Sequence, residues 1–268
     1  MVVVAYARAA AAVLRVAGAV MSVNDACSNS VVEAASSAAL TSVLQAQLDD
    51  PNASLRPRFV FFDLDECLVM PATPFIDGLP GSDALCRRLA LCGEEVHNAL
   101  RRRMEVAYYD APLSLVDAGL PGVIADLQAR GVSIYGLTSR GRRQEQWSYA
   151  WHNSRVVGLL AQHTIRFSTL ADEHLGPHGE NTEAGGILYA GAVHPAYNNK
   201  VVLMQAVTRG APSTLVDNSA SKLCKATELR RACVHGVHFT AAWAREATDA
   251  ERRKWIVMQS AQRSGFDA

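Results

Sequence analysis

The chain has 268 residues, of which 49% are hydrophobic and 19% charged, and its 26 Lys and Arg residues balance its 26 Asp and Glu residues. This composition is too apolar for a disordered chain and lacks the glycine period of collagen. Zero net charge gives no overall attraction to nucleic acid or anionic lipid, so any basic surface must be local, and we expect no nucleic acid partner. The length suits one large domain, or one domain with a sizeable insertion.

Residues 1–40 are rich in alanine and have no acidic residue before Asp25. The apolar stretch Ala9–Val20 is interrupted by Arg15 and is too short for a stable transmembrane helix. It fits an export signal, an organellar transit peptide, or a weakly structured extension of a cytoplasmic protein. We therefore expect an N-terminal extension over residues 1–54 and a domain over residues 55–268. Alanine faces bury little apolar area, so residues 1–40 are expected to pack little against that domain.

The domain is expected to begin with a buried strand at Phe59–Phe62, a short aromatic and β-branched run. The strand leads directly into Asp63-Leu64-Asp65-Glu66. Proline and glycine residues then break regular structure, and a helical pattern follows over residues 82–107. The stretch from about residue 70 to 120 is long enough for a small helical cap inserted into the domain.

The rest of the chain alternates strand and helix patterns. Further strands are expected at residues 132–137, 186–190, 214–216 and 234–239. Further helices are expected at residues 121–130, 142–160 and 200–208, with another from Thr248, where Glu251 completes a capping box. This alternation predicts an α/β domain with a mainly parallel, Rossmann-like sheet.

Chemistry-bearing side chains follow the predicted strands. Asp63 and Asp65 come after the first strand, Thr138 after the second and Asp217 after residues 214–216, while Lys200 opens a helix. Ligands of parallel α/β sheets bind beyond the carboxyl ends of the strands. Any one of these residues alone is typical of a turn or a helix cap. The ordered set favours a functional site.

The set resembles the four motifs of the haloacid dehalogenase (HAD) superfamily. Asp63–Asp65 matches the first motif, Gly136–Ser139 the second, Lys200 the third and Val216–Asn218 the fourth. The chain looks most similar to the DUF2608 branch, and this likeness rests on Val116–Pro121, Leu127–Gly141, Gly186–Tyr189 and His238–Phe239. The resemblance runs from about Arg58 to Gln259. It implies a HAD core whose helical cap covers the site, and magnesium-dependent chemistry on a small phosphorylated substrate.

The groups themselves indicate roles in phosphoryl transfer, which needs a nucleophile, charge neutralisation and an acid for the leaving group. Asp63 would be the nucleophile that forms an aspartyl-phosphate, and Asp65 the acid and then the base. Thr138 would donate a hydrogen bond to a phosphoryl oxygen, and Lys200 would supply positive charge. Clustered carboxylates need a cation, so Asp63, Asp217 and the carbonyl of Asp65 would hold Mg²⁺.

Two positions depart from the family pattern. Cys67 stands where the superfamily usually has a threonine, and a thiol is the poorer hydrogen-bond donor, which predicts a less rigid turn. Asn218 and Ser221 stand where the fourth motif usually has a second acid. One metal-site carboxylate is therefore missing, which predicts weak magnesium binding or low activity.

Three hypotheses remain for the function. The first is a magnesium-dependent phosphatase, and the second is a catalytically weakened or inactive HAD-like protein that serves as a binding or interaction module. The third is that the motif resemblance is misleading and the carboxylates of the set only cap helices or turns. Asp65 argues against dehalogenase chemistry, because dehalogenases of this fold lack the second aspartate.

Several other residues fit ordinary structural roles. Two interpretations are open for Arg101–Arg103. The three arginines either bind an anionic substrate or, as is usual for a charged helix face, are exposed to solvent. His235 and His238 are predicted to point to opposite faces of a strand and to be structural. The six cysteines form no CxxC pair and fit reduced thiols, with disulfides expected only in an exported protein. No feature indicates an oligomeric state.

Overall fold

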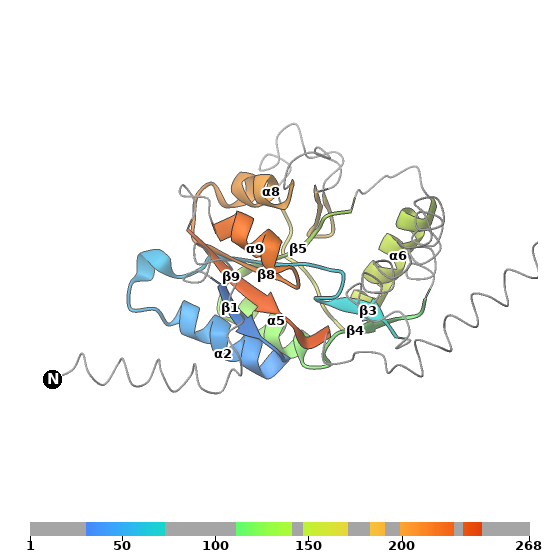
Figure 1. Cartoon of the computed structure of the whole chain (residues 1–268), viewed down its shortest axis with the longest axis horizontal. Helices are drawn as coiled ribbons and strands as arrows, with labels where there is room; N and C mark the ends of the chain where they lie inside the picture. The colour runs from blue at the N-terminus through green and yellow to red at the C-terminus, as the bar shows by residue number, and fades with distance from the viewer. Residues whose placement is uncertain are drawn as a thin grey trace, which may run out of the picture.

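The computed structural model describes residues 31–72, 111–140, 147–170, 183–190, 199–227 and 233–242 (Figure 1). Within these ranges seven strands form one sheet: β1 (Val31–Ala34), β2 (Phe59–Phe62), β5 (Ser133–Thr138), β6 (Glu183–Ala184), β7 (Ile187–Tyr189), β8 (Ser213–Asp217) and β9 (Val234–Phe239). A second sheet pairs β3 (Val69–Pro71) with β4 (Leu113–Leu115). The described α-helices are α2 (Ser37–Leu48), α5 (Leu120–Ala129), α6 (Trp147–Gln162), α8 (Asn199–Thr208) and α9 (Ala220–Thr227), and Ala53–Leu55 forms a 3₁₀ turn.

The large sheet is mainly parallel, as the alternation of elements predicted. Its strand order is β1-β9-β8-β2-β5-β7-β6, and only the β6–β7 pair is antiparallel among the described strands. Strand β2 therefore lies in the middle, with β8 on one side and β5 on the other. The carboxyl ends of these three strands meet at one edge, which is where a Rossmann-like sheet offers a site.

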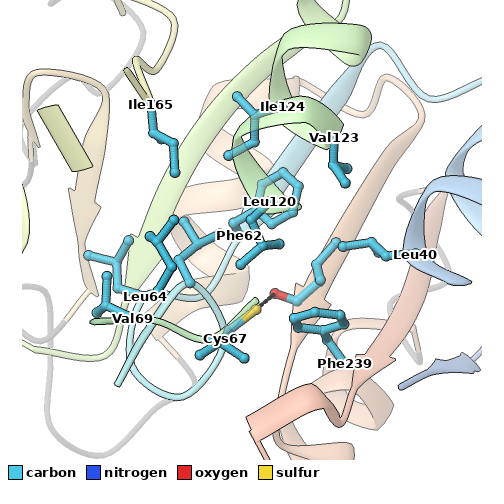
Figure 2. Close-up of a cluster of buried hydrophobic side chains, with 14 of the residues drawn as sticks. Leu40, Phe62, Leu64, Cys67, Val69, Leu120, Val123, Ile124, Ile165 and Phe239 are labelled. Carbon is cyan, nitrogen blue, oxygen red and sulfur yellow. Dashed lines mark hydrogen bonds between the residues drawn. The ribbon is translucent and has the colours of Figure 1, made fainter. Parts of the chain in front are cut away.

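Helices cover both faces of the sheet. Alternate residues of β2 point to opposite faces, so Phe61 joins one buried cluster and Val60 and Phe62 join the other. The Phe61 cluster includes apolar residues of α8 and α9, and the Phe62 cluster includes those of α2, α5 and α6. Figure 1 shows α8 and α9 on one side of the strands and α2 and α5 on the other. Figure 2 shows Leu40 of α2 beside Phe62 and the α5 residues.

The expected elements are found wherever the structure describes them. The strands at 59–62, 132–137, 186–190, 214–216 and 234–239 correspond to β2, β5, β7, β8 and β9 within one or two residues. Helices α5 and α8 match the predicted ranges, and α6 covers the described part of 142–160. The helix expected at 82–107, the helix from Thr248 and most of the proposed cap lie outside the described residues. At the base of that insertion, β3 and β4 pair antiparallel, with Pro71 opposite Leu113.

The expectation that residues 1–54 form a separate extension is wrong for residues 31–48. Strand β1 pairs in parallel with β9 at the sheet edge, and Leu40 and Leu44 of α2 are fully buried. Ser36 caps α2, since its side chain accepts a hydrogen bond from the backbone N–H of Ala39. Leu40 and Leu44, four residues apart, pack into the core. The high alanine content of this stretch gives no indication of that contact. Residues 1–30 lie outside the described part of the chain.

No helix in the described part of the chain is long and apolar enough to cross a membrane. Cys67, Cys224 and Cys233 are free, and the other three cysteines lie outside the described residues. His235 and His238 each bond a backbone carbonyl, of Leu55 and of Asn218, as structural histidines do.

We predict that α2 is an integral part of the fold. Leu40→Ala removes a fully buried side chain and should lower the free energy of unfolding by about 2–5 kcal/mol. Leu55→Ala makes the same chemical change at a side chain that is 39% exposed and should cost well under 1 kcal/mol, the usual range for a surface substitution. Urea unfolding measures both. Equal small effects for the two variants would show that α2 docks weakly.

Candidate active site

The site is built where the three central strands end. Phe62, the last residue of β2, is paired with Val216 of β8 and with Gly136 of β5. The next residue, Asp63, stays in register, because its backbone N–H donates to the carbonyl of Val216 at 2.9 Å. Asp217 ends β8 beside it. Parallel pairing thus places the two carboxylates next to each other at the same edge.

A buried lysine joins these two carboxylates. The Lys200 Nζ atom lies 2.6 Å from Asp63 Oδ1 and 2.6 Å from Asp217 Oδ2. Only 1% of the Lys200 side chain is exposed, and Asp63 and Asp217 are buried as well. Helix α8 positions the lysine at its start, because Leu203 and Met204 of the same helix are buried against the sheet. A buried ammonium requires such partners, since an unpaired charge in the interior is very costly.

Burial and the neighbouring charges shift the pKa values of both Asp63 and Lys200. Burial and the neighbouring Asp217 raise the pKa of Asp63 from 3.8 to about 6, although Lys200 and Lys222 act in the opposite direction. The Lys222 Nζ atom is 3.9 Å from Asp63 Oδ2. Burial by itself lowers the pKa of Lys200, but the two carboxylates outweigh it, so this pKa is raised. Burial and Asp217 together therefore outweigh the two lysines and disfavour the ionised form of Asp63, and a further cation beside it would favour that form.

The second aspartate has two cationic or polar partners of its own. Asp65 Oδ2 is 3.0 Å from Arg140 Nε, and Asp65 Oδ1 is 3.2 Å from Nε2 of the fully buried His152. Burial opposes ionisation of Asp65, but Arg140 and His152 overcome it and lower its pKa from 3.8 to about 2. Asp65 is thus a carboxylate in the resting site, whereas the pKa of Asp63 is held closer to neutral pH.

Thr138 is linked to Asp65 through the same arginine. Its Oγ1 atom accepts hydrogen bonds from the backbone N–H of Arg140 at 3.2 Å and from Arg140 Nε at 3.3 Å. A hydroxyl that accepts in this way keeps its own hydrogen as a donor. Thr138 can therefore donate to an oxygen of a bound ligand while Arg140 fixes its position.

The turn after Asp63 is held mainly by backbone hydrogen bonds. Leu64 carbonyl accepts from the N–H groups of Leu68 and Val69, and the Glu66 N–H donates to Val69 carbonyl at 2.7 Å. Cys67 adds a contact from its thiol to the carbonyl of Val216 at 3.6 Å, drawn as the dashed line in Figure 2. Burial and the nearby Asp63 raise the pKa of this thiol, so it stays protonated and able to donate.

Asn218 has a partner that the sequence did not suggest. Its Nδ2 atom donates to Glu66 Oε2 at 3.0 Å, and Glu66 is buried. Asn218, which the motif resemblance aligns with a second acid, therefore faces an acid from the turn after Asp63. Asp217 is oriented independently, since its Oδ1 accepts from the backbone N–H of Ser219 at 2.8 Å. Ser221 Oγ lies 3.1 Å from Ser219 Oγ.

The donor set fits a hard divalent cation only in part. Asp63 and Asp217 offer adjacent carboxylates at the same edge of the sheet. Lys200 nevertheless occupies one oxygen of each carboxylate, and the described residues contain no group of three His, Cys, Asp or Glu side chains that could hold a metal. A magnesium ion here would depend on few protein oxygens and several waters.

All five residues singled out from the sequence lie at this edge: Asp63, Asp65, Thr138, Lys200 and Asp217. Sequence reasoning missed Arg140 and His152. Arg140 comes two residues after the end of β5, so a search for polar residues at the carboxyl ends of strands, which predicts Thr138, also indicates Arg140. His152 lies inside α6, 87 residues from Asp65, and no local signal marks it.

No protein-family model, no curated protein and no solved structure matches this chain. The fold defines an α/β protein with a Rossmann-like sheet, and the interpretation of the site rests on its geometry and on the motif resemblance.

We predict a pH-dependent stability difference at Asp63. Its folded pKa of about 6 exceeds the unfolded value of 3.8, so the folded state binds more protons between these values. The contribution of Asp63 to the free energy of unfolding should therefore fall as pH rises from 4 to 7, by up to about 3 kcal/mol. An asparagine side chain does not titrate, so Asp63→Asn should gain stability relative to wild type across this window.

Denaturant unfolding in EDTA at several pH values measures this difference. Asp49→Asn changes a carboxylate whose side chain is 64% exposed and should follow the wild type. A constant difference between Asp63→Asn and wild type from pH 4 to 7 would contradict the raised pKa.

Proposed function

We propose that the protein is a magnesium-dependent phosphohydrolase that forms an aspartyl-phosphate on Asp63, with a small phosphorylated compound as substrate. The observation that carries this proposal is the buried Lys200, which bridges Asp63 and Asp217 at the carboxyl edge of the sheet. The motif resemblance to the HAD superfamily, and to its DUF2608 branch, supports it.

In the first step Asp63 would attack the phosphorus atom, so that a carboxylate oxygen–phosphorus bond forms as the bond to the leaving oxygen breaks. Its Oδ2 is the freer oxygen, because Oδ1 is taken by Lys200 and by the backbone N–H of Leu64. Lys200 would offset charge on the phosphoryl oxygens, and Thr138 would donate a hydrogen bond to one of them. The nucleophile is held by the sheet register and so needs no rearrangement.

Asp65 would move the protons. As a resting carboxylate it suits the second step, in which it removes a proton from the water that hydrolyses the aspartyl-phosphate. In the first step a dianionic phosphoryl group beside Asp65 raises its pKa, which favours the protonated form that a leaving oxygen needs. Asp63, Asp217 and the Asp65 carbonyl would hold Mg²⁺, which would add positive charge at the phosphoryl group.

A second candidate function is a catalytically weakened or inactive HAD-like protein that binds a ligand or partner without turning it over. Two observations favour it specifically. Lys200 contacts both carboxylates that a metal would use, and Asn218 pairs with Glu66 where relatives usually have a second acid. Both candidates use the same site, and turnover separates them.

The test of the proposed function is phosphate release from p-nitrophenyl phosphate and a broad set of phosphate esters, with and without magnesium. Asp63→Asn keeps the shape of the side chain but removes the nucleophile, so turnover should fall by on the order of 10³-fold or more. Asp49→Asn, at an exposed carboxylate, should retain the wild-type rate.

Equal phosphate release by wild type and Asp63→Asn would overturn the assignment of the nucleophile. If no ester is hydrolysed and calorimetry detects no magnesium binding, the non-catalytic function takes its place.

We predict that Asn218→Asp lowers the free energy of unfolding of the metal-free protein and raises its affinity for magnesium. The new carboxylate faces Glu66, so the variant loses a hydrogen bond to a charged group and gains repulsion, which should cost about 1–3 kcal/mol in EDTA. Magnesium should then bind more tightly and raise its thermal midpoint more than that of the wild type.

Asn218→Ala is the matched control, because it loses the same hydrogen bond without adding charge. It should be destabilised in EDTA and show no added response to magnesium. Identical magnesium responses of Asn218→Asp and Asn218→Ala would place the metal away from this position.

A further inference from the structure

Arg140 is buried, yet four of the five N–H donors of its guanidinium are unused within the described part of the chain. Only 6% of the residue is exposed. Its backbone N–H donates to Thr138 Oγ1, and its Nε atom is shared between Thr138 Oγ1 at 3.3 Å and Asp65 Oδ2 at 3.0 Å. The two terminal nitrogens, Nη1 and Nη2, have no hydrogen-bond partner among the residues that the structure describes.

Such an arrangement is costly unless something else supplies the missing acceptors. Each buried N–H group without a partner loses its hydration and gains no hydrogen bond in return, and the loss is larger for a charged group. An arginine cannot avoid this cost by deprotonation, because its guanidinium stays charged in proteins. Asp65 neutralises the charge through Nε but leaves the two terminal nitrogens, which form the fork, without partners.

The fork is also held in place at the active edge of the sheet. Thr138 ends β5, and Asp65 follows β2, so two contacts from neighbouring strand ends fix the guanidinium. The group is therefore preorganised, which lowers the entropic cost of binding a ligand. A guanidinium fork matches an oxyanion that can accept two parallel hydrogen bonds.

We propose, resting on the phosphohydrolase function above, that Arg140 is a substrate-binding residue whose Nη1 and Nη2 atoms take two oxygens of the phosphate group of the ligand. The same chemistry would suit a carboxylate. Phosphate is favoured because Arg140 Nε contacts Thr138 Oγ1, whose hydroxyl hydrogen is the neighbouring donor, and because a tetrahedral dianion has oxygens for both.

Equilibrium binding to the full chain tests the proposal without requiring turnover. Isothermal titration calorimetry with inorganic phosphate, and separately with acetate, is carried out with and without magnesium on wild type, Arg140→Gln and Arg140→Lys. Arg130→Gln is the control, since Arg130 is an exposed arginine that pairs with Asp49 at 3.1 Å. Thermal unfolding confirms that each variant is folded.

We expect Arg140→Gln to bind phosphate about 10- to 100-fold more weakly than wild type, because two charge-assisted hydrogen bonds are lost. Arg140→Lys keeps a positive charge beside Asp65 but has no fork, so it should recover only part of the affinity. Arg130→Gln should bind as the wild type does. Adding guanidinium ion to folded Arg140→Gly should restore part of the phosphate affinity.

A purely structural Arg140 would give a different result. Its variants would then melt at lower temperature but bind phosphate with wild-type affinity, and this outcome overturns the proposal. Arg140-dependent binding of acetate but not of phosphate overturns the choice of ligand. Arg140-dependent phosphate binding without any ester hydrolysis would retain this inference while the proposed function fails. If esters are hydrolysed but phosphate binding does not depend on Arg140, the proposed function is retained and the role of Arg140 is overturned.

Discussion

The ion pairs of Lys200 with Asp63 and Asp217 are the constraint on which the site depends. Three buried charges can coexist only because each carboxylate lies 2.6 Å from the same ammonium. That geometry in turn requires β2 and β8 to be adjacent, parallel and in register, and α8 to begin directly beside their ends. The fold thus holds two like charges together, and burial, with the neighbouring Asp217, keeps the pKa of Asp63 high.

Around this pair the site divides into two parts with different electrostatics. On one side Lys200 bridges Asp63 and Asp217, and burial together with Asp217 raises the pKa of Asp63. On the other side Asp65 has both Arg140 and His152, which keep it ionised. In the proposed function a phosphate group would lie between them, and its oxygens would accept from Arg140 and Thr138. Two aspartates only two residues apart therefore acquire different protonation behaviour from their surroundings, as a nucleophile and a proton carrier require.

Much of this arrangement could be predicted from local patterns. Short apolar runs such as Phe59–Phe62 define the strands, and the polar residue after each run marks the edge at which a parallel sheet places its site. Contacts made across long sequence separations could not be predicted. His152 reaches Asp65 from the middle of a helix, and Asn218 bonds Glu66 across 152 residues. The alanine-rich composition of residues 1–40 predicts an extension, but residues 31–48 belong to the fold. Average composition gives no sign of the two buried leucines of α2 or of the edge strand that pairs with β9.

The most direct test of the central claim, that the lysine-paired Asp63 accepts a phosphoryl group, is to trap the intermediate. The full chain is mixed with p-nitrophenyl phosphate and magnesium, quenched and reduced with borohydride, which converts an aspartyl-phosphate to homoserine, and the peptides are mapped by mass spectrometry. Homoserine at position 63 in the wild type, and at no aspartate in Asp63→Asn, is the predicted result. Homoserine at Asp65 or Asp217, or hydrolysis without any modified aspartate, would contradict the account.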